Sequence, residues 1–357
     1  MSQTDSTSPR LLFTVLNWGM GHATRSLPLI EEAGRNGWTV HVASNGTALQ
    51  FLRTQCAQVR VFFHEKPNQE ILYAKRGNRL KIALQMPGFL RNIRTERQWT
   101  EQFVAAHDIT HVVSDNCYGV NTPRVPCALI SHQWHLPVQS IGQWAVDAFV
   151  RKQARHFDAL WTPDIDDLPG LSGKLGAPTG MPSHLQRIGV LSRLPQSGTP
   201  QNWKRVGMVS GPEPQRSLME CALKKWMSHD GLGGLIISGN PDGIVQEDQG
   251  VTTWPNPSAE QLAGALQSAD TVICRSGYSS LLDLAALGVR AILVPTPGQS
   301  EQIYLAEHWA QSFGFAICTQ LDLEEGRIPE IQGAIPSQPA NMRALETLNN
   351  WVHTTTS

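Results

Sequence analysis

Short apolar runs recur along the chain, and each is followed by a polar or glycine-containing turn. Such runs, about four to eight residues long, are typical of parallel strands buried on both faces. The segments between them have a helical spacing of apolar residues; in the first, Leu27, Ile30 and Ala33 share one face. This alternation predicts an α/β protein with parallel sheets. The predicted strands cover residues 11–16, 38–43, 58–63, 111–114, 128–131, 159–161, 205–209, 234–238 and 251–254, and another begins at residue 272.

The length of 357 residues predicts two domains. We place the first over residues 1–191, a linker over 192–204 and the second over 205–357, and we expect the final helix to pack back on the first domain. Between residues 163 and 185, proline, glycine, aspartate and serine predict a loop. Further helices are predicted at residues 46–55, 99–106, 140–156 and 217–228.

Composition narrows the class of protein. The net charge is −1, so no overall positive field favours nucleic acid as a partner. The polar N-terminus is not followed by an apolar signal region, and no apolar run approaches about 18 residues, so we expect a cytoplasmic protein without a membrane span. The six cysteines form no C-x-x-C pair, which predicts buried thiols rather than a zinc site or a disulfide framework.

The segment 272–302 carries the most informative pattern. It is ordered as strand, small-residue turn, helix, second strand and a loop rich in proline and amides. At the start of the helix, backbone N–H groups and the positive end of the helix dipole suit a phosphate. A plain βαβ unit with a well-capped helix is the alternative. The candidate binding residues are Arg275, Ser276, Gly277, Tyr278, Ser279, Asp283, Gln299 and Gln302.

A second pattern follows the first strand. Gly19 and Gly21 allow a tight turn that brings His22 to a helix N-terminus, in a G-x-G-H-x-x-R motif ending at Arg25. A dinucleotide-binding protein would have a third glycine where this chain has Thr24, and an acidic residue after the second strand, which is lacking here. For His22 the alternative is a capping histidine that bonds only to the backbone.

Together the two patterns resemble those of GT-B glycosyltransferases, especially the MurG-like enzymes of family 28. The resemblance covers residues 269–270, 274–283 and 295–302, with the G-x-G-H-x-x-R motif as an independent second match. It implies two Rossmann-like domains with parallel sheets that face a central cleft, a nucleotide-sugar on the C-terminal domain and an acceptor on the N-terminal domain. It also implies that Asp283, which is usually glutamate in the family, binds the ribose.

Residues after two other strands of the second domain extend the candidate donor site. Ser210, Gly211 and Arg216 follow the strand 205–209, where the resemblance implies a loop facing the donor diphosphate and where Arg216 would supply a cation. A proline-rich turn with a solvated arginine is the alternative. Trp254 is interpreted either as a contact of the base or as a core residue.

The first domain offers two further candidates at strand ends, where open α/β sheets bind ligands. Asp115 is a second candidate base, and His132, beyond the next strand, is a candidate acceptor contact. We also expect Gly21 to lie beside the donor.

Residues 73–97 contain seven cations and a single acid, Glu96, with apolar residues interleaved. This mixture suits an anionic membrane surface or a lipid-phosphate acceptor, and Arg91, Arg94 and Arg97 are the candidate contacts. A solvated charged face is the alternative. The remaining cations are Lys75, Arg76, Arg79 and Lys81.

The resemblance therefore predicts an inverting glycosyltransferase that needs neither metal nor cofactor. It would move a sugar from a UDP-sugar to a hydroxyl of a glycan, a lipid or a small molecule of the cell envelope, at the inner face of the cytoplasmic membrane. His22, or else Asp115, would act as the base. Two alternatives remain: a nucleotide-sugar hydrolase or epimerase of the same fold, and a non-catalytic nucleotide-sugar-binding regulator.

Overall fold

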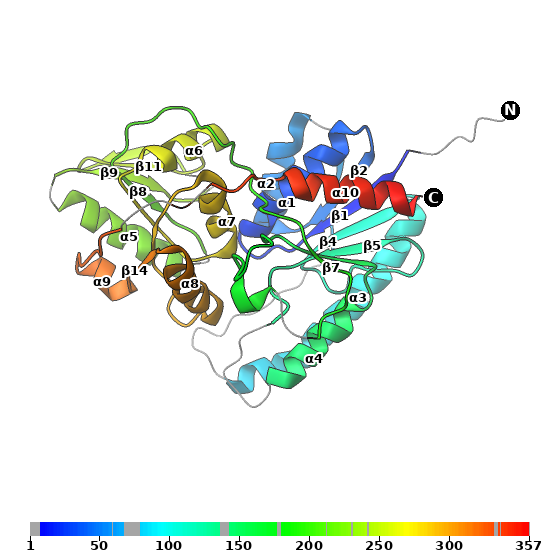
Figure 1. Cartoon of the computed structure of the whole chain (residues 1–357). Coiled ribbons are helices and arrows are strands. Elements are labelled where there is room, and N and C mark those ends of the chain that lie inside the picture. Colours follow the sequence, from blue (N-terminus) through cyan, green and yellow to red (C-terminus); the bar gives the residue numbers. More distant parts are fainter. Residues whose placement is uncertain are drawn as a thin grey trace. The chain divides into compact units, whose positions relative to one another are not determined.

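The computed structural model describes two compact units, one containing most of the N-terminal half and one most of the C-terminal half (Figure 1). The first unit comprises Met1–Asp164, Leu175–Gly189 and Met342–Ser357, and the second comprises Ile165–Lys174 and Val190–Asn341. The described residues are 8–58, 60–67, 79–135, 143–176, 180–211, 213–229, 231–240, 243–331, 335 and 337–356, with the backbone alone at 58 and 79–87.

The first unit contains a seven-stranded parallel sheet in the order β3-β2-β1-β4-β5-β6-β7. Its strands are β1 (Arg10–Val15), β2 (Thr39–Ser44), β3 (Val61–Glu65), β4 (His111–Asp115), β5 (Cys127–Ile130), β6 (Ala159–Thr162) and β7 (Leu185–Arg187). Its helices are α1 (Gly21–Arg35), α2 (Gly46–Gln55), α3 (Arg79–Ala106), α4 (Gln143–Ala154) and α10 (Met342–Thr355), with a short 3₁₀ turn, η1 (Cys56–Gln58).

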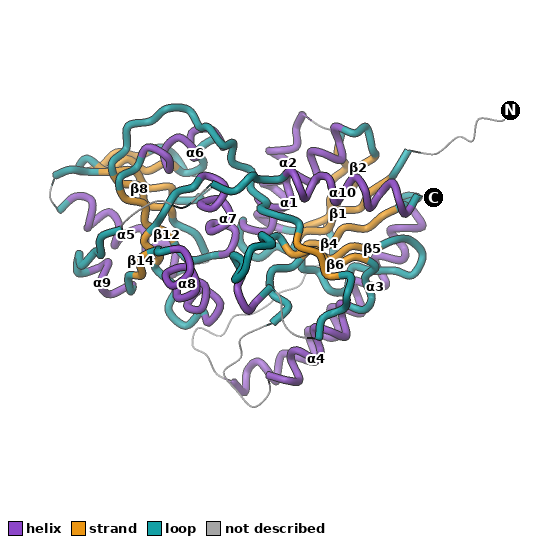
Figure 2. Tube along the Cα trace, in the orientation of Figure 1, coloured by secondary structure: helices purple, strands orange, loops and turns teal. Residues whose placement is uncertain are grey.

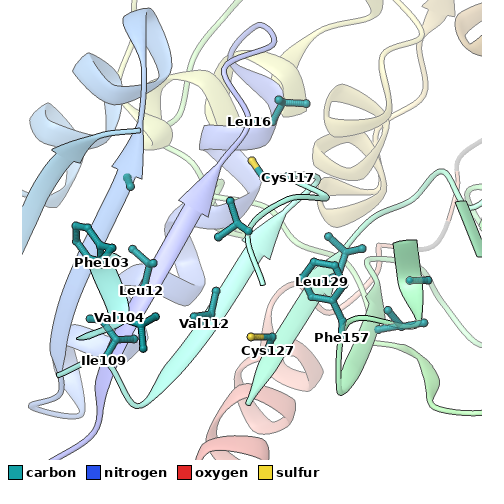
Figure 3. Packing of buried hydrophobic residues seen from close by; sticks show 14 of the residues in the cluster. Leu12, Leu16, Phe103, Val104, Ile109, Val112, Cys117, Cys127, Leu129 and Phe157 are labelled. Carbon is teal, nitrogen blue, oxygen red and sulfur yellow. The ribbon is translucent and has the colours of Figure 1, made fainter. Parts of the chain in front are cut away.

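The core of this unit lies between the sheet and the helices that cover it. Leu12, Val112 and Leu129 come from three neighbouring strands, and Phe103 from α3 packs in the same cluster (Figure 3). All three strand residues are fully buried, as the apolar runs of the sequence predict for a sheet covered on both faces.

The second unit repeats this architecture, with its strands drawn in orange in Figure 2. Its sheet has the order β10-β11-β9-β8-β12-β13-β14, and only the β10–β11 pair is antiparallel. The strands are β8 (Arg205–Met208), β9 (Gly234–Ile237), β10 (Gln246–Asp248), β11 (Val251–Trp254), β12 (Thr271–Cys274), β13 (Ile292–Leu293) and β14 (Ala316–Ile317). The helices are α5 (Gln215–Ser228), α6 (Ala259–Ser268), α7 (Tyr278–Leu287), α8 (Ser300–Phe313) and α9 (Gln320–Glu324).

Each sheet therefore has one point where the strand order reverses, between β1 and β4 in the first unit and between β8 and β12 in the second. In open α/β sheets the strand ends diverge there and leave room for a ligand. The loops after these four strands carry most of the predicted site residues.

Three expectations about the chain's organisation need correction. The predicted helix 99–106 is the last part of α3, which is 28 residues long. Residues 165–174 leave the first unit and group with the second, where the carbonyl of Leu171 accepts a 2.8 Å hydrogen bond from Trp309 Nε1. The expected linker 192–204 also belongs to the second unit, because Thr199 N donates to the Glu260 carbonyl at 3.0 Å.

The last helix, α10, belongs to the first unit (Figure 1). Asn349 Oδ1 accepts a 2.8 Å hydrogen bond from Asn36 at the end of α1, and Trp351 makes edge contacts with Trp161 and His111. Asn36 and Asn349 are more than three hundred positions apart in the sequence.

Candidate active site

One candidate site, in the first unit, begins at the turn between β1 and α1. Gly19 adopts a φ of +67°, which L-residues with a side chain rarely take, and α1 then begins at Gly21. No described side chain caps α1, and the first turn has no acidic residue. The turn places His22 in the first turn of α1, beside the end of β1.

Asp115 is the last residue of β4 and lies beside Val15, the last residue of β1. Its Oδ1 is 2.8 Å from His22 Nδ1, and its Oδ2 accepts a 2.7 Å hydrogen bond from Ser26 Oγ. Burial alone would raise the pKa of Asp115, but the charge of Arg25, and after it that of His22, holds this pKa well below its usual range. Asp115 therefore stays ionised and orients His22, so it is a poor candidate for a general base.

Arg25 is the residue that the sequence interpretation left without a role. Its buried guanidinium donates to both oxygens of Asp115, with an Nε–Oδ2 distance of 2.8 Å, and its Nη1 lies 2.9 Å from His132 Nδ1. Arg25 and Ser26 stand three and four positions after His22, so the helical period already placed them on its face. This spacing is the sequence feature that could have predicted the contacts of Arg25 and Ser26 with the His22 site.

The cluster thus joins His22, Arg25, Ser26, Asp115 and His132 from α1, the end of β4 and the loop after β5. His22 Nε2 forms no hydrogen bond to any residue that the structure describes, and the side chain is 11% exposed. A histidine held at Nδ1 by an ionised carboxylate, with Nε2 unbonded, has the arrangement of a general base.

A second candidate site, in the second unit, is the N-terminus of α7. Gly277 is the N-cap residue, no described side chain caps the helix, and the first turn, which includes Tyr278 and Ser279, has no acidic residue. A Cβ built on Gly277 meets no atom within 4 Å, so the turn borders open space. The positive end of the helix dipole and an uncrowded turn suit an anion.

The loops after β12 and β13 are joined by side chains, as their order in the sequence suggested. Ser276 Oγ donates to the Gln302 carbonyl at 2.7 Å, and Gln302 Oε1 accepts from Thr296 N at 2.9 Å. Gln302 Nε2 donates to Gln299 Oε1 at 2.7 Å. Gln302 is buried and braces the loop, whereas the side chain of Gln299 is partly exposed.

Arg275, one of the candidate binding residues of the segment 272–302, is bonded to the protein backbone instead, so this expectation needs correction. The side chain is fully buried, and its guanidinium donates to the carbonyls of Val294 at 3.1 Å and Gln215 at 3.0 Å. Burial lowers its pKa to about 10. Arg275 ties together the backbone at the start of α5 and the end of β13.

Arg216 is likewise already paired. Its Nε donates to Glu213 Oε1 at 2.9 Å, while Glu213 Oε2 accepts from Ser217 N and Oγ in the first turn of α5. A carboxylate therefore occupies the positive end of α5. Ser210 and Gly211 precede α5, whose N-terminus is already supplied with an anion. This favours α7 over α5 as the helix that binds a diphosphate.

Asp283 lies at the start of the second half of α7 and is partly buried. Its Oδ1 accepts a 2.5 Å hydrogen bond from Ser192 Oγ, and its Oδ2 accepts no hydrogen bond from the residues that the structure describes. Burial raises the pKa of Asp283 to about 6, against the opposing effects of the Ser192 hydrogen bond and the Arg193 charge. The sequence interpretation missed Ser192 and Arg193, because they lie in the segment taken for a linker.

The other predicted contacts have mixed outcomes. Trp254 is partly buried and packs edge-on against Trp203, with ring centroids 5.8 Å apart. Arg91 and Arg94 are exposed on α3, but Nε and Nη2 of Arg97 are buried, so Arg97 is a poor surface contact. The cations at positions 75 and 76 and the side chains of Arg79 and Lys81 lie outside the described residues.

Over the part of the chain that the structure describes, no group of three or more His, Cys, Asp or Glu side chains is arranged to hold a metal ion. None of the described helices combines the length and the apolar character that a membrane crossing requires.

Sequence comparison relates the second unit to a family of transferases. Residues 249–335 match the profile of the Glycosyltransferase family 28 C-terminal domain. The UDP-N-acetylglucosamine–N-acetylmuramyl-(pentapeptide) pyrophosphoryl-undecaprenol N-acetylglucosamine transferase of Rhizobium meliloti (strain 1021) is 33% identical over 97 residues, 27% of this chain and 26% of that relative. The enzyme of the same description from Burkholderia thailandensis is 39% identical over 69 residues, 19% of each chain. The chain thus spans about a quarter or less of the length of these relatives.

Structural comparison covers nearly the whole chain. The spinosyn rhamnosyltransferase SpnG, complexed with thymidine diphosphate, aligns with a TM-score of 0.57 and 13% identity over 89% of this chain and 90% of its own. MurG of Acinetobacter baumannii aligns with a TM-score of 0.52 and 13% identity over 98% of this chain and 91% of its own. These findings confirm the predicted GT-B fold. Together with the family profile, they confirm the resemblance of this chain to the family 28 glycosyltransferases.

Proposed function

We propose that the protein is an inverting, metal-independent glycosyltransferase that moves a sugar from a UDP-sugar to an acceptor hydroxyl. The observation that carries this proposal is the His22–Asp115 pair at the strand-order reversal of the first sheet. His22 Nε2 would take the proton of the acceptor hydroxyl as its oxygen attacks the anomeric carbon. Asp115 would hold Nδ1–H and stabilise the imidazolium that forms.

The donor assignment rests on the second unit. The matched family profile spans α7, and the names of the curated relatives specify UDP-N-acetylglucosamine. The open turn at Gly277 would receive the diphosphate, and the helix dipole would offset the charge that develops on it during departure. Asp283, whose Oδ2 accepts no hydrogen bond from the described residues, would accept one from the ribose.

Replacing the base tests the chemistry. His22→Ala should lower kcat by about 10²–10⁴-fold, and Asp115→Asn should also lower it because the imidazolium loses its counter-charge. Both variants should bind UDP by calorimetry as tightly as the unaltered protein, because the donor residues lie in the other unit. His184→Ala, which removes an exposed histidine, is the matched control. Turnover within a few-fold of normal in His22→Ala would place the base elsewhere.

A donor-site variant and an acceptor-free assay separate the alternatives. Asp283→Ala should weaken UDP-sugar binding by about 1–3 kcal/mol, the range for a hydrogen bond to a charged group. Release of free sugar without any acceptor would identify a hydrolase. Donor binding without turnover across a broad acceptor panel would identify a binding protein and contradict the proposal.

We also propose that the acceptor is presented at an anionic membrane, as a lipid-linked or envelope glycan. Leu90, Arg91 and Arg94 form one exposed stretch of α3, and Leu90 is 41% exposed. The double variant Arg91→Glu/Arg94→Glu should lose co-sedimentation with phosphatidylglycerol vesicles, at roughly 1 kcal/mol per cation. The charge-matched control, Arg53→Glu/Arg124→Glu, alters exposed arginines elsewhere and should still bind. Absence of vesicle binding at low salt would favour a soluble acceptor.

A further inference from the structure

The buried Arg25 guanidinium is bonded through three of its nitrogens. Nε lies 2.8 Å from Asp115 Oδ2, Nη2 contacts Asp115 Oδ1, and Nη1 lies 2.9 Å from His132 Nδ1. The Arg25 side chain is 1% exposed and that of Asp115 is 2% exposed. A charge-assisted pair with two parallel hydrogen bonds is rigid, so the position of Nη1 beside His132 is determined by the pairing with Asp115.

An arginine constrains the proton of the histidine that it meets. The guanidinium has five N–H donors and no acceptor, and it keeps its charge at every physiological pH. His132 Nδ1, at 2.9 Å from Nη1, must therefore accept, because two N–H groups would otherwise point at each other. The neutral imidazole of His132 then carries its hydrogen on Nε2.

The opposite constraint applies to His22. Its Nδ1 lies 2.8 Å from Asp115 Oδ1 and 3.0 Å from Arg25 Nη2. A lone pair on Nδ1 would face an ionised oxygen at 2.8 Å, whereas a hydrogen on Nδ1 makes a charge-assisted bond. Arg25 Nη2 also lies within hydrogen-bonding distance of Nδ1, but the ionised carboxylate oxygen is the closer partner, so we assign the hydrogen to Nδ1. His22 then carries its hydrogen on Nδ1 and its lone pair on Nε2.

We propose that Arg25 is a positioning residue that sets the two histidines of this cluster in opposite tautomers, His22 as Nδ1–H and His132 as Nε2–H. One ring is thereby reserved as a proton acceptor at Nε2, and the other is excluded as a second base. The inference gives Arg25 a role beyond balancing the charge of Asp115. Its relevance to sugar transfer rests on the proposed function, but the tautomers themselves do not.

Nitrogen NMR measures the tautomers directly. Protein labelled with ¹⁵N at the histidine rings distinguishes Nδ1–H from Nε2–H, and loss of one signal set in His22→Gln or His132→Gln assigns each ring. In the unaltered protein, the neutral ring of His22 should be Nδ1–H and the neutral ring of His132 should be Nε2–H. The ring of the exposed His184, which lies outside this cluster, serves as the internal reference. A neutral His132 ring in the Nδ1–H form would overturn the proposal without involving any variant of Arg25.

The variant Arg25→Lys tests whether Arg25 sets the tautomer of His132, because it keeps the positive charge and removes the planar guanidinium. His132 should then show a mixture of both tautomers, and His22 should remain Nδ1–H because Asp115 is retained. A single Nε2–H tautomer of His132 in folded Arg25→Lys would show that another group sets it and would refute the role of Arg25. If Arg25→Lys does not fold, Arg25→Gln serves as the second variant, since its single amide cannot bridge Asp115 and His132. If the tautomers are as stated but no sugar is transferred, the proposed function fails and the inference stands.

Discussion

Acidification should destabilise the first unit through two buried histidines, His41 on β2 and His111 on β4. They are 3% and 1% exposed. Burial lowers the pKa of His41 to about 4, with smaller contributions from the charges of His64, His107 and Arg10. Burial likewise lowers the pKa of His111 to about 4, against a small opposing effect of the Val352 backbone.

The sign and the size follow from these pKa values. An unfolded histidine titrates near 6.5, so between about pH 6.5 and pH 4 the unfolded chain binds more protons than the folded chain. Stability is therefore full above about pH 6.5 and is lost as the pH falls towards 4. At pH 5 each histidine costs about 2 kcal/mol, from about 1.5 pH units at 1.36 kcal/mol each. The two together cost about 4 kcal/mol, which is large beside the typical free energy of unfolding of about 5–15 kcal/mol.

Hydrogen exchange of the amides in β4 and α10 reports the free energy of unfolding of the first unit at about pH 7.5 and pH 5, after correction for the intrinsic exchange rates. His111 Nε2 forms a 2.9 Å hydrogen bond with Thr355 Oγ1 in α10. Protonation of His111 should therefore affect both β4 and α10. His111→Gln should reduce the loss on acidification by about 2 kcal/mol. His184→Gln, at an exposed site, should leave it unchanged. An equal loss in His111→Gln and the unaltered protein would refute the reasoning. Asp283, whose pKa is raised and whose effect has the opposite sign, lies in the other unit and does not enter this measurement.

Three further predictions concern a buried ion pair, a closely packed glycine and an exposed helix cap. Lys66 and Glu96 form a buried ion pair with an Nζ–Oε1 distance of 2.8 Å. Lys66→Met should therefore lower the free energy of unfolding in urea by about 3–5 kcal/mol, and the additional change Glu96→Leu should restore most of this loss. Equal stability of the single and double variants would contradict this prediction. Gly119→Ala would bring a methyl group within 2.6 Å of Glu96 Cβ, so it should lower both thermal stability and turnover, and an unchanged melting temperature would show that the loop yields freely. Ser258→Ala removes the capping box of α6 and should cost about 1 kcal/mol, whereas Ser258→Asp should retain most of it; an Ala variant as stable as the Asp variant would rule out the cap.

The sequence alone determined both α/β layers and the positions of the key loops. Continuous apolar runs read as strands because a sheet covered on both faces excludes polar residues from its core, and β1, β4, β8 and β12 lie within a residue or two of their predicted places. The glycine turn placed His22 at the start of α1 for a local reason, since only glycine readily adopts the positive φ of Gly19.

Tertiary structure decided which side chains meet. His22 and Asp115 are 93 residues apart, and only the strand order brings the ends of β1 and β4 together. Tertiary structure also decided the partners of Arg275. It lies in a motif that predicts donor binding, but its guanidinium donates to backbone carbonyls of Val294 and Gln215, which are distant in the sequence. Arg216 was neutralised by a nearby acid, Glu213, whose orientation depends on the start of α5. Local patterns specify backbone conformation and burial, whereas the partner of a buried charge depends on contacts that form only when the sheets assemble.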